Sequence, residues 1–454
     1  MKNSMLIVLF ISLSVFAFSQ EAHKLTGRVT NFPGGLVYLA SFYGERAPVV
    51  DSLIISQDGV FEFEMNSSKT GGYYRVILIK DRYIDLIYNH ENIVFSTDYE
   101  NPFDSLHIIT SQENKIYYDF LSFIKNNQLK QDLLGPMVEY YPKDDPLYKE
   151  IRVRYHDIQQ NRRNYIDSIS EQYSGTYVSR VITTQQRPFL SADLIEKERI
   201  EYLKDHFWDE IPLNDTSLLR STVYPNLVME YLSLYGDRSF SQTELEESFM
   251  DAVDVIQWAA LDNDIIYGFI LEYLIKGFER YHFDKVLDHI ANNYAQEENC
   301  KNENLSTEVQ KRLENYQNLS VGKPAPAINM VDINQNSVTL NNRSSEYLLL
   351  VFWASWCPHC IQLLPRLTDI YSNNDLGLEI IAISLDNNQE DHLKAVEEGT
   401  YPWINCSDYK GWNSQAAVDY NIYATPTMFL LDKERNIITK PITYRELMIE
   451  LGKL

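Results

Sequence analysis

The chain has very little cysteine, four residues in 454, and fewer basic than acidic residues, 40 against 64. Four cysteines are too few for a disulfide scaffold, so any closely spaced pair is better explained by catalysis than by structure. No cysteine precedes Cys300, and we therefore expect no lipid anchor on an N-terminal cysteine. The net charge of −24 argues against nucleic acid or an anionic membrane surface as a partner.

Long apolar runs are also scarce. One run, Met5–Phe18, follows Lys2 and ends in Ala17-Phe18-Ser19, which places small residues before a cut at Ser19/Gln20. This pattern predicts a secretory signal peptide, residues 1–19. Because no stop-transfer pattern follows, we expect an exported, periplasmic protein of the cell envelope that is soluble after cleavage and has no stable membrane insertion.

The length predicts two or three domains after the signal peptide. Short alternating strands at regular spacing over residues 20–108 predict an antiparallel β-sandwich-like domain. Apolar residues at intervals of three and four predict an all-α domain over residues 109–318. Residues 319–454 alternate strands with helices and end in an antiparallel pair, which predicts an α/β domain. The expected helices of the middle domain are Ile116–Ile124, Tyr148–Tyr173, Leu194–Phe207, Val223–Tyr235, Thr243–Leu261 and Ile265–Tyr281.

The most informative stretch is an apolar run that ends in two cysteines with two residues between them, Cys357-Pro-His-Cys360. A buried strand, Leu348–Trp353, delivers Cys357 to the start of a helix, where unpaired N–H groups and the helix dipole favour a thiolate. Pro358 suits a first helical turn because it lacks the N–H that would have no partner there. Cys360 lies on the same helix face, near enough for a disulfide. This pattern predicts a redox-active dithiol.

Two motifs carry a resemblance to a known family. Trp353–Cys360, with Pro365 in the following helix, resembles the active site of the thioredoxin fold, and Ala424–Asp432 resembles its cis-proline loop. The lead-in Val321–Pro326 and the strand Ile380–Asp386 resemble the TlpA/ResA-like thiol–disulfide oxidoreductases exported by Gram-negative bacteria. The resemblance covers about 130 residues at this spacing of motifs. The preceding β-rich and helical parts resemble, more loosely, the extensions of such proteins.

The resemblance implies a thioredoxin-like domain that exchanges disulfides with envelope proteins without a cofactor. Cys357 is then the nucleophile and Cys360 the resolving thiol. Pro426 is expected to be cis, placing the Thr425 backbone beside the substrate, with Trp356 and Pro358 as further substrate-binding residues. The implied partners are envelope proteins with thiols or disulfides and a redox partner that recycles the dithiol. The sequence leaves open a homodimer and the direction of electron flow.

His359 lies between the cysteines, and a positive imidazole there lowers the pKa of the nearby thiol and favours a more oxidising couple. Pro-His is also the dipeptide of the strongly oxidising DsbA-type enzymes. Two acids of related proteins are replaced here, by Val351 in the central strand and by Leu363 after the second cysteine. The proton of Cys360 is therefore taken up by His359, by water or by a group such as Asp386, or the deprotonation of Cys360 is slow.

Several alternatives compete with this interpretation. A zinc site is not expected, because Cys300 and Cys406 are single and no second ligand pair has suitable spacing. A thiol peroxidase normally has a proline and a Thr or Ser where this chain has Leu350 and Ala354. A binding or scaffold protein of the envelope with a regulatory redox domain remains the alternative function. Cys300 and Cys406 are expected to be buried free thiols, with a disulfide between them as the alternative.

Overall fold

The computed structural model describes residues 23–66, 69–79, 81–281, 283–294, 307–341, 343–372, 376–441 and 443–454. The expected signal peptide lies outside these ranges. The chain divides into two compact units, one up to Leu234 and one from Tyr235. The expected middle domain contributes helices to both units, and its boundaries at 108 and 318 stay a prediction. Within the described ranges, no helix is long and apolar enough to cross a membrane.

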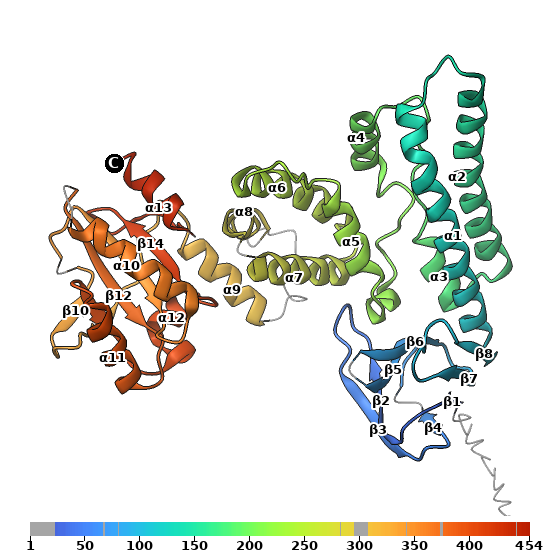
Figure 1. Ribbon diagram of the computed structural model, residues 1–454, viewed down its shortest axis with the longest axis horizontal. Helices are drawn as coiled ribbons and strands as arrows, with labels where there is room; N and C mark the ends of the chain where they lie inside the picture. The colour runs from blue at the N-terminus through green and yellow to red at the C-terminus, as the bar shows by residue number, and fades with distance from the viewer. Residues whose placement is uncertain are drawn as a thin grey trace, which may run out of the picture. The chain divides into compact units, whose positions relative to one another are not determined.

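The first unit begins with β-strands that form two four-stranded sheets, ordered β4-β1-β7-β8 and β3-β2-β5-β6 (Figure 1). Side chains from both sheets form one hydrophobic core. In β4, for example, alternate residues Phe61, Phe63 and Met65 are buried, as the period of a strand requires. The strands are β1 (His23–Thr30), β2 (Gly35–Ser41), β3 (Val49–Ile55), β4 (Val60–Met65), β5 (Gly72–Ile79), β6 (Arg82–Tyr88), β7 (Ile93–Asp98) and β8 (His107–Thr110).

The expectation of a wholly antiparallel arrangement is wrong for one strand pair. β1 pairs with β7 in parallel, with Leu25 opposite Ile93 and Thr30 opposite Asp98. The parallel pairing joins strands far apart in sequence, which the spacing of strands and turns cannot reveal. The other strand pairs of the two sheets are antiparallel.

Most helices of the first unit follow the expected periodicity with different bounds, while α3 (Tyr177–Thr183) was not expected from the sequence. The expected helix at Ile116–Ile124 extends to Tyr140 and contains Pro136, and its first turn is capped by Ser111, whose hydroxyl accepts the Asn114 N–H. The helices are α1 (Gln112–Tyr140), α2 (Pro146–Gln172), α3 (Tyr177–Thr183), α4 (Glu196–His206), the 3₁₀ helix η1 (Thr216–Arg220) and α5 (Val223–Ser233).

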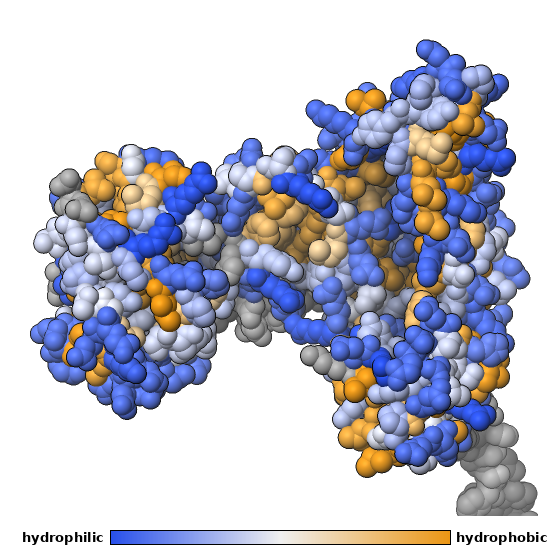
Figure 2. Space-filling model, viewed as in Figure 1, coloured by the Kyte–Doolittle hydropathy of each residue, from blue (hydrophilic) through white to orange (hydrophobic). Residues whose placement is uncertain are grey.

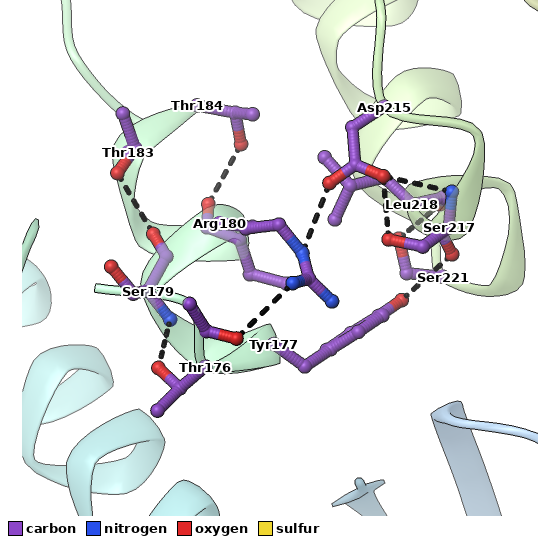
Figure 3. Close-up of polar contacts among 12 residues, drawn as sticks. Thr176, Tyr177, Ser179, Arg180, Thr183, Thr184, Asp215, Ser217, Leu218 and Ser221 are labelled. Atoms are coloured by element: carbon purple, nitrogen blue, oxygen red, sulfur yellow. Dashed lines mark hydrogen bonds and ion pairs between the residues drawn. The ribbon is translucent and has the colours of Figure 1, made fainter. Parts of the chain in front are cut away.

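Polar contacts tie α3 to η1 in this unit (Figure 3). The Arg180 guanidinium lies 3.0 Å from the Asp215 carboxylate, which also accepts the N–H and the hydroxyl of Ser217. The Tyr177 hydroxyl donates to the Ser217 carbonyl at 3.3 Å. Because Asp215 caps the 3₁₀ helix and pairs with Arg180, we interpret this network as structural.

The second unit contains further helices and then the C-terminal domain. The helix α8 was not expected from the sequence, although it supplies buried residues such as Leu287 and Ile290. The helices are α6 (Gln242–Ala259), α7 (Asp264–Tyr281), α8 (Asp284–Tyr294), α9 (Thr307–Asn318), α10 (Pro358–Ser372), α11 (Gln389–Gly399), the 3₁₀ helix η3 (Gly411–Asn413), α12 (Gln415–Asp419) and α13 (Tyr444–Leu451). The strands are β9 (Asn329–Val331), β10 (Ser337–Thr339), β11 (Tyr347–Trp353), β12 (Leu378–Ser384), β13 (Ile404–Cys406), β14 (Thr427–Leu431) and β15 (Ile437–Thr439).

The C-terminal domain is built on a five-stranded sheet in the order β13-β12-β11-β14-β15. The central strand β11 runs parallel to β12 and antiparallel to β14. Leu348, Leu350 and Phe352 pack into a core shared with α12, while the intervening residues of β11 face a second core shared with α10 and α13. Burial of both faces explains why this strand reads as a continuous apolar run.

The surface seen in Figure 2 is largely hydrophilic, with separate apolar patches. This agrees with the high content of acidic residues. One of the exposed apolar side chains of the C-terminal domain, Trp356, lies directly before the first cysteine of the motif.

Candidate active site

The central strand delivers Cys357 to the start of α10, as the sequence predicts. The carbonyl of Trp353, the last residue of β11, accepts the Leu385 N–H at 2.8 Å and fixes the end of the strand. A turn follows, in which the Cys357 N–H donates to the Ala354 carbonyl at 3.1 Å. The helix begins at Pro358. Cys357 therefore lies where the unpaired N–H groups of the helix converge.

The turn before Cys357 is held by a buried carboxylate. Asp386, 1% exposed, accepts the Ser355 backbone N–H at 3.1 and 3.2 Å and the Ser355 hydroxyl at 2.7 Å. It also accepts the Ser384 hydroxyl at 2.6 Å. Asp386 follows β12, and its hydrogen bonds thus tie the cysteine turn to the neighbouring strand. The sequence suggests Asp386 as one candidate for taking the proton of Cys360. In the structure, its hydrogen bonds position the turn before Cys357.

The loop before β14 meets Cys357 from the other side. The Thr425–Pro426 peptide is cis, and the Cys357 thiol donates to the Thr425 carbonyl at 3.2 Å. The residues of the two sequence motifs are 68 positions apart. The structure therefore brings Cys357, Thr425 and Pro426 together, as the sequence motifs predict.

The two thiols differ in pKa. Burial pushes the pKa of Cys357 upwards, but hydrogen bonds from Cys360, Thr425 and the backbone N–H groups of Cys360 and His359 outweigh it, so the pKa lies below that of an ordinary thiol. Burial, followed by the hydrogen bond to Cys357, raises the pKa of Cys360 to about 12. The side chains are 4% and 0% exposed. Cys357 is therefore the thiol that ionises first and the one nearer the surface.

The remaining predicted site residues line the outside of the motif. Trp356, Pro358 and His359 are exposed, and Thr425 and Pro426 are half-buried. The backbone N–H of His359 contributes to lowering the pKa of Cys357. Val351 and Leu363 are buried apolar residues behind the cysteines, so no carboxylate occupies either position.

Two polar residues near the cysteines carry no motif that marks them in the sequence. Tyr401 packs against the core that contains Cys360, with its ring stacked on Trp403 at 5.3 Å. A Cβ on Gly399 would lie 2.2 Å from the Tyr401 ring, so glycine makes room for it. His392 is fully buried at 5.8 Å from the Trp353 ring. Burial lowers the pKa of His392, which favours the neutral imidazole.

The other expectations about cysteines and metals concern residues elsewhere. Cys406 is a buried free thiol, and burial raises its pKa to about 12. Cys300 lies outside the described residues, and the expectation that it is a free thiol stays a prediction. Across the described part of the chain, no group of three or more His, Cys, Asp or Glu residues is placed to hold a metal ion.

Two family models match parts of this chain. Residues 321–440 match the AhpC/TSA family, and residues 23–117 match a domain of unknown function, DUF4369. The chain is 26% identical over 125 residues to the thiol-disulfide oxidoreductase ResA of Bacillus cereus, which covers 27% of this chain and 70% of that protein.

Among solved structures, the thioredoxin domain of a thiol-disulfide oxidoreductase from Bacteroides vulgatus is 32% identical, with a TM-score of 0.28, over 30% of this chain and 97% of that one. A domain of a possible thiol-disulfide isomerase from Cytophaga hutchinsonii is 34% identical, with a TM-score of 0.28, over 30% of this chain and 92% of that one.

Proposed function

We propose that Cys357 and Cys360 exchange disulfides with envelope proteins, because residues 321–440 match the AhpC/TSA family model and the relatives of this region include thioredoxin-like thiol–disulfide oxidoreductases. The observation that carries this proposal is the difference between the two thiols. Cys357 has a lowered pKa and meets the Thr425 carbonyl, while Cys360 lies behind it with a pKa near 12. Cys357 is therefore the thiol that ionises and attacks first, and Cys360 is the thiol that resolves the mixed disulfide.

The exchange proceeds in two balanced steps. The Cys357 thiolate attacks one sulfur of a client disulfide, forms a mixed disulfide and releases the other client sulfur as a thiolate. Cys360 then loses its proton and attacks the Cys357 sulfur, which releases the second client thiolate. Two electrons have passed to the client, and Cys357 and Cys360 are joined by a disulfide. The reverse sequence donates a disulfide, so the chemistry allows either direction.

Substrate binding is assigned to the residues around Cys357. Thr425, preceding Pro426, offers its backbone beside the sulfur, while Trp356 and Pro358 border the site. Deprotonation of Cys360 requires a base, and we propose His359 or water as that base. Asp386 is less suited, because its oxygens are engaged by Ser355 and Ser384.

We further propose that the couple is more oxidising than thioredoxin, whose potential is about −270 mV. The hydrogen bonds that stabilise the Cys357 thiolate also stabilise the reduced form. Titration of wild type and H359A against glutathione measures this. A wild-type potential at or below that of thioredoxin contradicts the proposal. The rate at which Cys360 resolves a mixed disulfide is measured separately in wild type and H359A, and equal rates show that His359 does not transfer the proton.

The activity itself is tested by disulfide exchange with a protein substrate. We expect Cys357→Ser to abolish thiol-dependent turnover and Cys360→Ala to accumulate mixed disulfides, because the resolving step is lost. Mass spectrometry of the trapped adducts identifies clients and the recycling partner. A wild-type protein without turnover supports the scaffold function instead.

We place this exchange in the periplasm of the envelope. The support is the N-terminal pattern in the sequence, which predicts export with cleavage near Ser19/Gln20. Sequencing the N-terminus of the mature protein from an envelope fraction tests the assignment, and an intact Met1 there contradicts it. The oligomeric state, including a homodimer, is measured by sedimentation of the same sample.

A further inference from the structure

Two exposed tryptophans lie next to the redox-active motif. Trp356 immediately precedes Cys357 and is 54% exposed. Trp412, on η3, is 42% exposed, and its ring lies 6.2 Å from that of Trp356 at an angle of 57°. We call these two residues the tryptophan pair. Covering large apolar rings that are exposed to water lowers the free energy, so such rings favour binding of a partner.

The loop that carries Trp412 is anchored to the same strand end as the cysteine turn. The Ser407 hydroxyl donates to the Ser384 carbonyl at 3.0 Å and accepts the Tyr409 N–H at 3.2 Å. Ser384 also donates to Asp386, which in turn holds Ser355. The two indoles are therefore carried by two loops fixed at the end of β12.

Gly411 allows the close approach of these loops. Its backbone φ is +56°, a value that residues other than glycine rarely adopt. A Cβ atom at this position would lie 2.5 Å from the Asn387 Oδ1 atom. Asn387 directly follows Asp386. The chain thus passes tightly against this loop immediately before Trp412, which fixes the position of the indole beside the site.

The geometry indicates what covers the tryptophan pair. The Cys357 side chain is 4% exposed, so a client sulfur reaches it only when the client surface seats closely on the surrounding residues. The pair directly adjoins this point of contact. Indole rings bind apolar and aromatic side chains and are frequent hot spots of protein interfaces.

We propose that Trp412, together with Trp356, binds an apolar or aromatic side chain next to the reacting cysteine of the client protein. This inference rests on the proposed function and names the client chemistry that the site selects. Trp412 makes no covalent bond. Its role is to hold the client segment while the client sulfur forms the mixed disulfide with Cys357.

The test uses two glutathionylated decapeptides that differ only in the residue before cysteine, phenylalanine or serine. The full-length wild type is expected to prefer the phenylalanine peptide in kcat/KM. W412A is expected to lower this preference about tenfold, and W412F about twofold, because a smaller ring retains part of the contact. W258A removes a tryptophan that is 73% exposed on α6 and is expected to keep the wild-type preference.

An unchanged preference in W412A overturns the proposal, and so does an equal loss on both peptides, which indicates a general distortion of the site. If no variant turns over either peptide, the proposed function fails, and binding decides the inference separately. Binding is measured by calorimetry with the phenylalanine peptide in which serine replaces cysteine. The protein is the C357S/C360S variant, with and without the additional W412A substitution. Weaker binding with W412A supports the proposal, and equal binding contradicts it. A wild-type dimer that W412A dissociates assigns the tryptophan pair to a second copy instead.

Discussion

Selective alkylation provides a direct test of the two unequal thiols. Burial pushes the pKa of Cys357 upwards, but hydrogen bonds outweigh it and hold the pKa below 9, while burial raises the pKa of Cys360 to about 12. At pH 8 the thiolate fraction is at least about 0.1 for Cys357 and about 10⁻⁴ for Cys360, a ratio of roughly 10³. A more basic thiolate is intrinsically more nucleophilic, and a Brønsted coefficient of about 0.4–0.5 over three pKa units offsets this ratio by about 25-fold.

We therefore expect Cys357 to react with iodoacetamide faster than Cys360 in the reduced, folded protein, by a factor on the order of 40. Peptide mapping by mass spectrometry over time measures both rates. Cys406 is fully buried, with a pKa of about 12, and is expected to react only on unfolding. The rate for Cys357 is expected to rise with pH and level off above a midpoint lower than 9.

Protein unfolded in guanidinium is the control, because all cysteines then have similar pKa values and react at similar rates. Cys360 is also expected to stay slow in C357S, since burial is the largest cause of its raised pKa. Labelling of Cys360 within fivefold of Cys357 in the folded wild type refutes this account of the site.

Three further predictions concern stability, measured by urea unfolding. Burial raises the pKa of Glu246 from 4.5 to about 7, so its ionisation opposes folding increasingly between those pH values. E246Q is expected to gain up to about 3 kcal/mol over wild type above pH 7 and little below pH 4.5, whereas E247Q, at an exposed neighbour, gains nothing at either pH. D386A is expected to lower the free energy of unfolding by about 3 kcal/mol and S355A by about 1 kcal/mol, because removing the carboxylate leaves several donors without an acceptor. Equal losses in the two variants contradict this expectation. L350A is expected to lose about 2–5 kcal/mol through a cavity in the central sheet, and a loss below about 1 kcal/mol argues against its burial.

Much of the C-terminal domain could be predicted from the sequence. The apolar run Leu348–Trp353 lies in β11, and the expected antiparallel pair near the end of the chain is formed by β14 and β15. These elements are readable because burial imposes a period on neighbouring residues. The strand β13 and the helix α8 escaped prediction, since three residues carry too little period and a short amphipathic segment resembles its polar surroundings.

The sequence by itself determined the chemistry of this protein, because a dithiol at the start of a helix and a Thr-Pro motif before a strand are properties of adjacent residues. Only the tertiary structure decided which distant groups serve that chemistry. Asp386 holds Ser355 across 31 positions, and Trp412 lies beside Trp356. The parallel pairing of β1 with β7 was likewise hidden. Such contacts depend on how strands order themselves in a sheet, and that order is set by the packing of the whole core rather than by any local pattern.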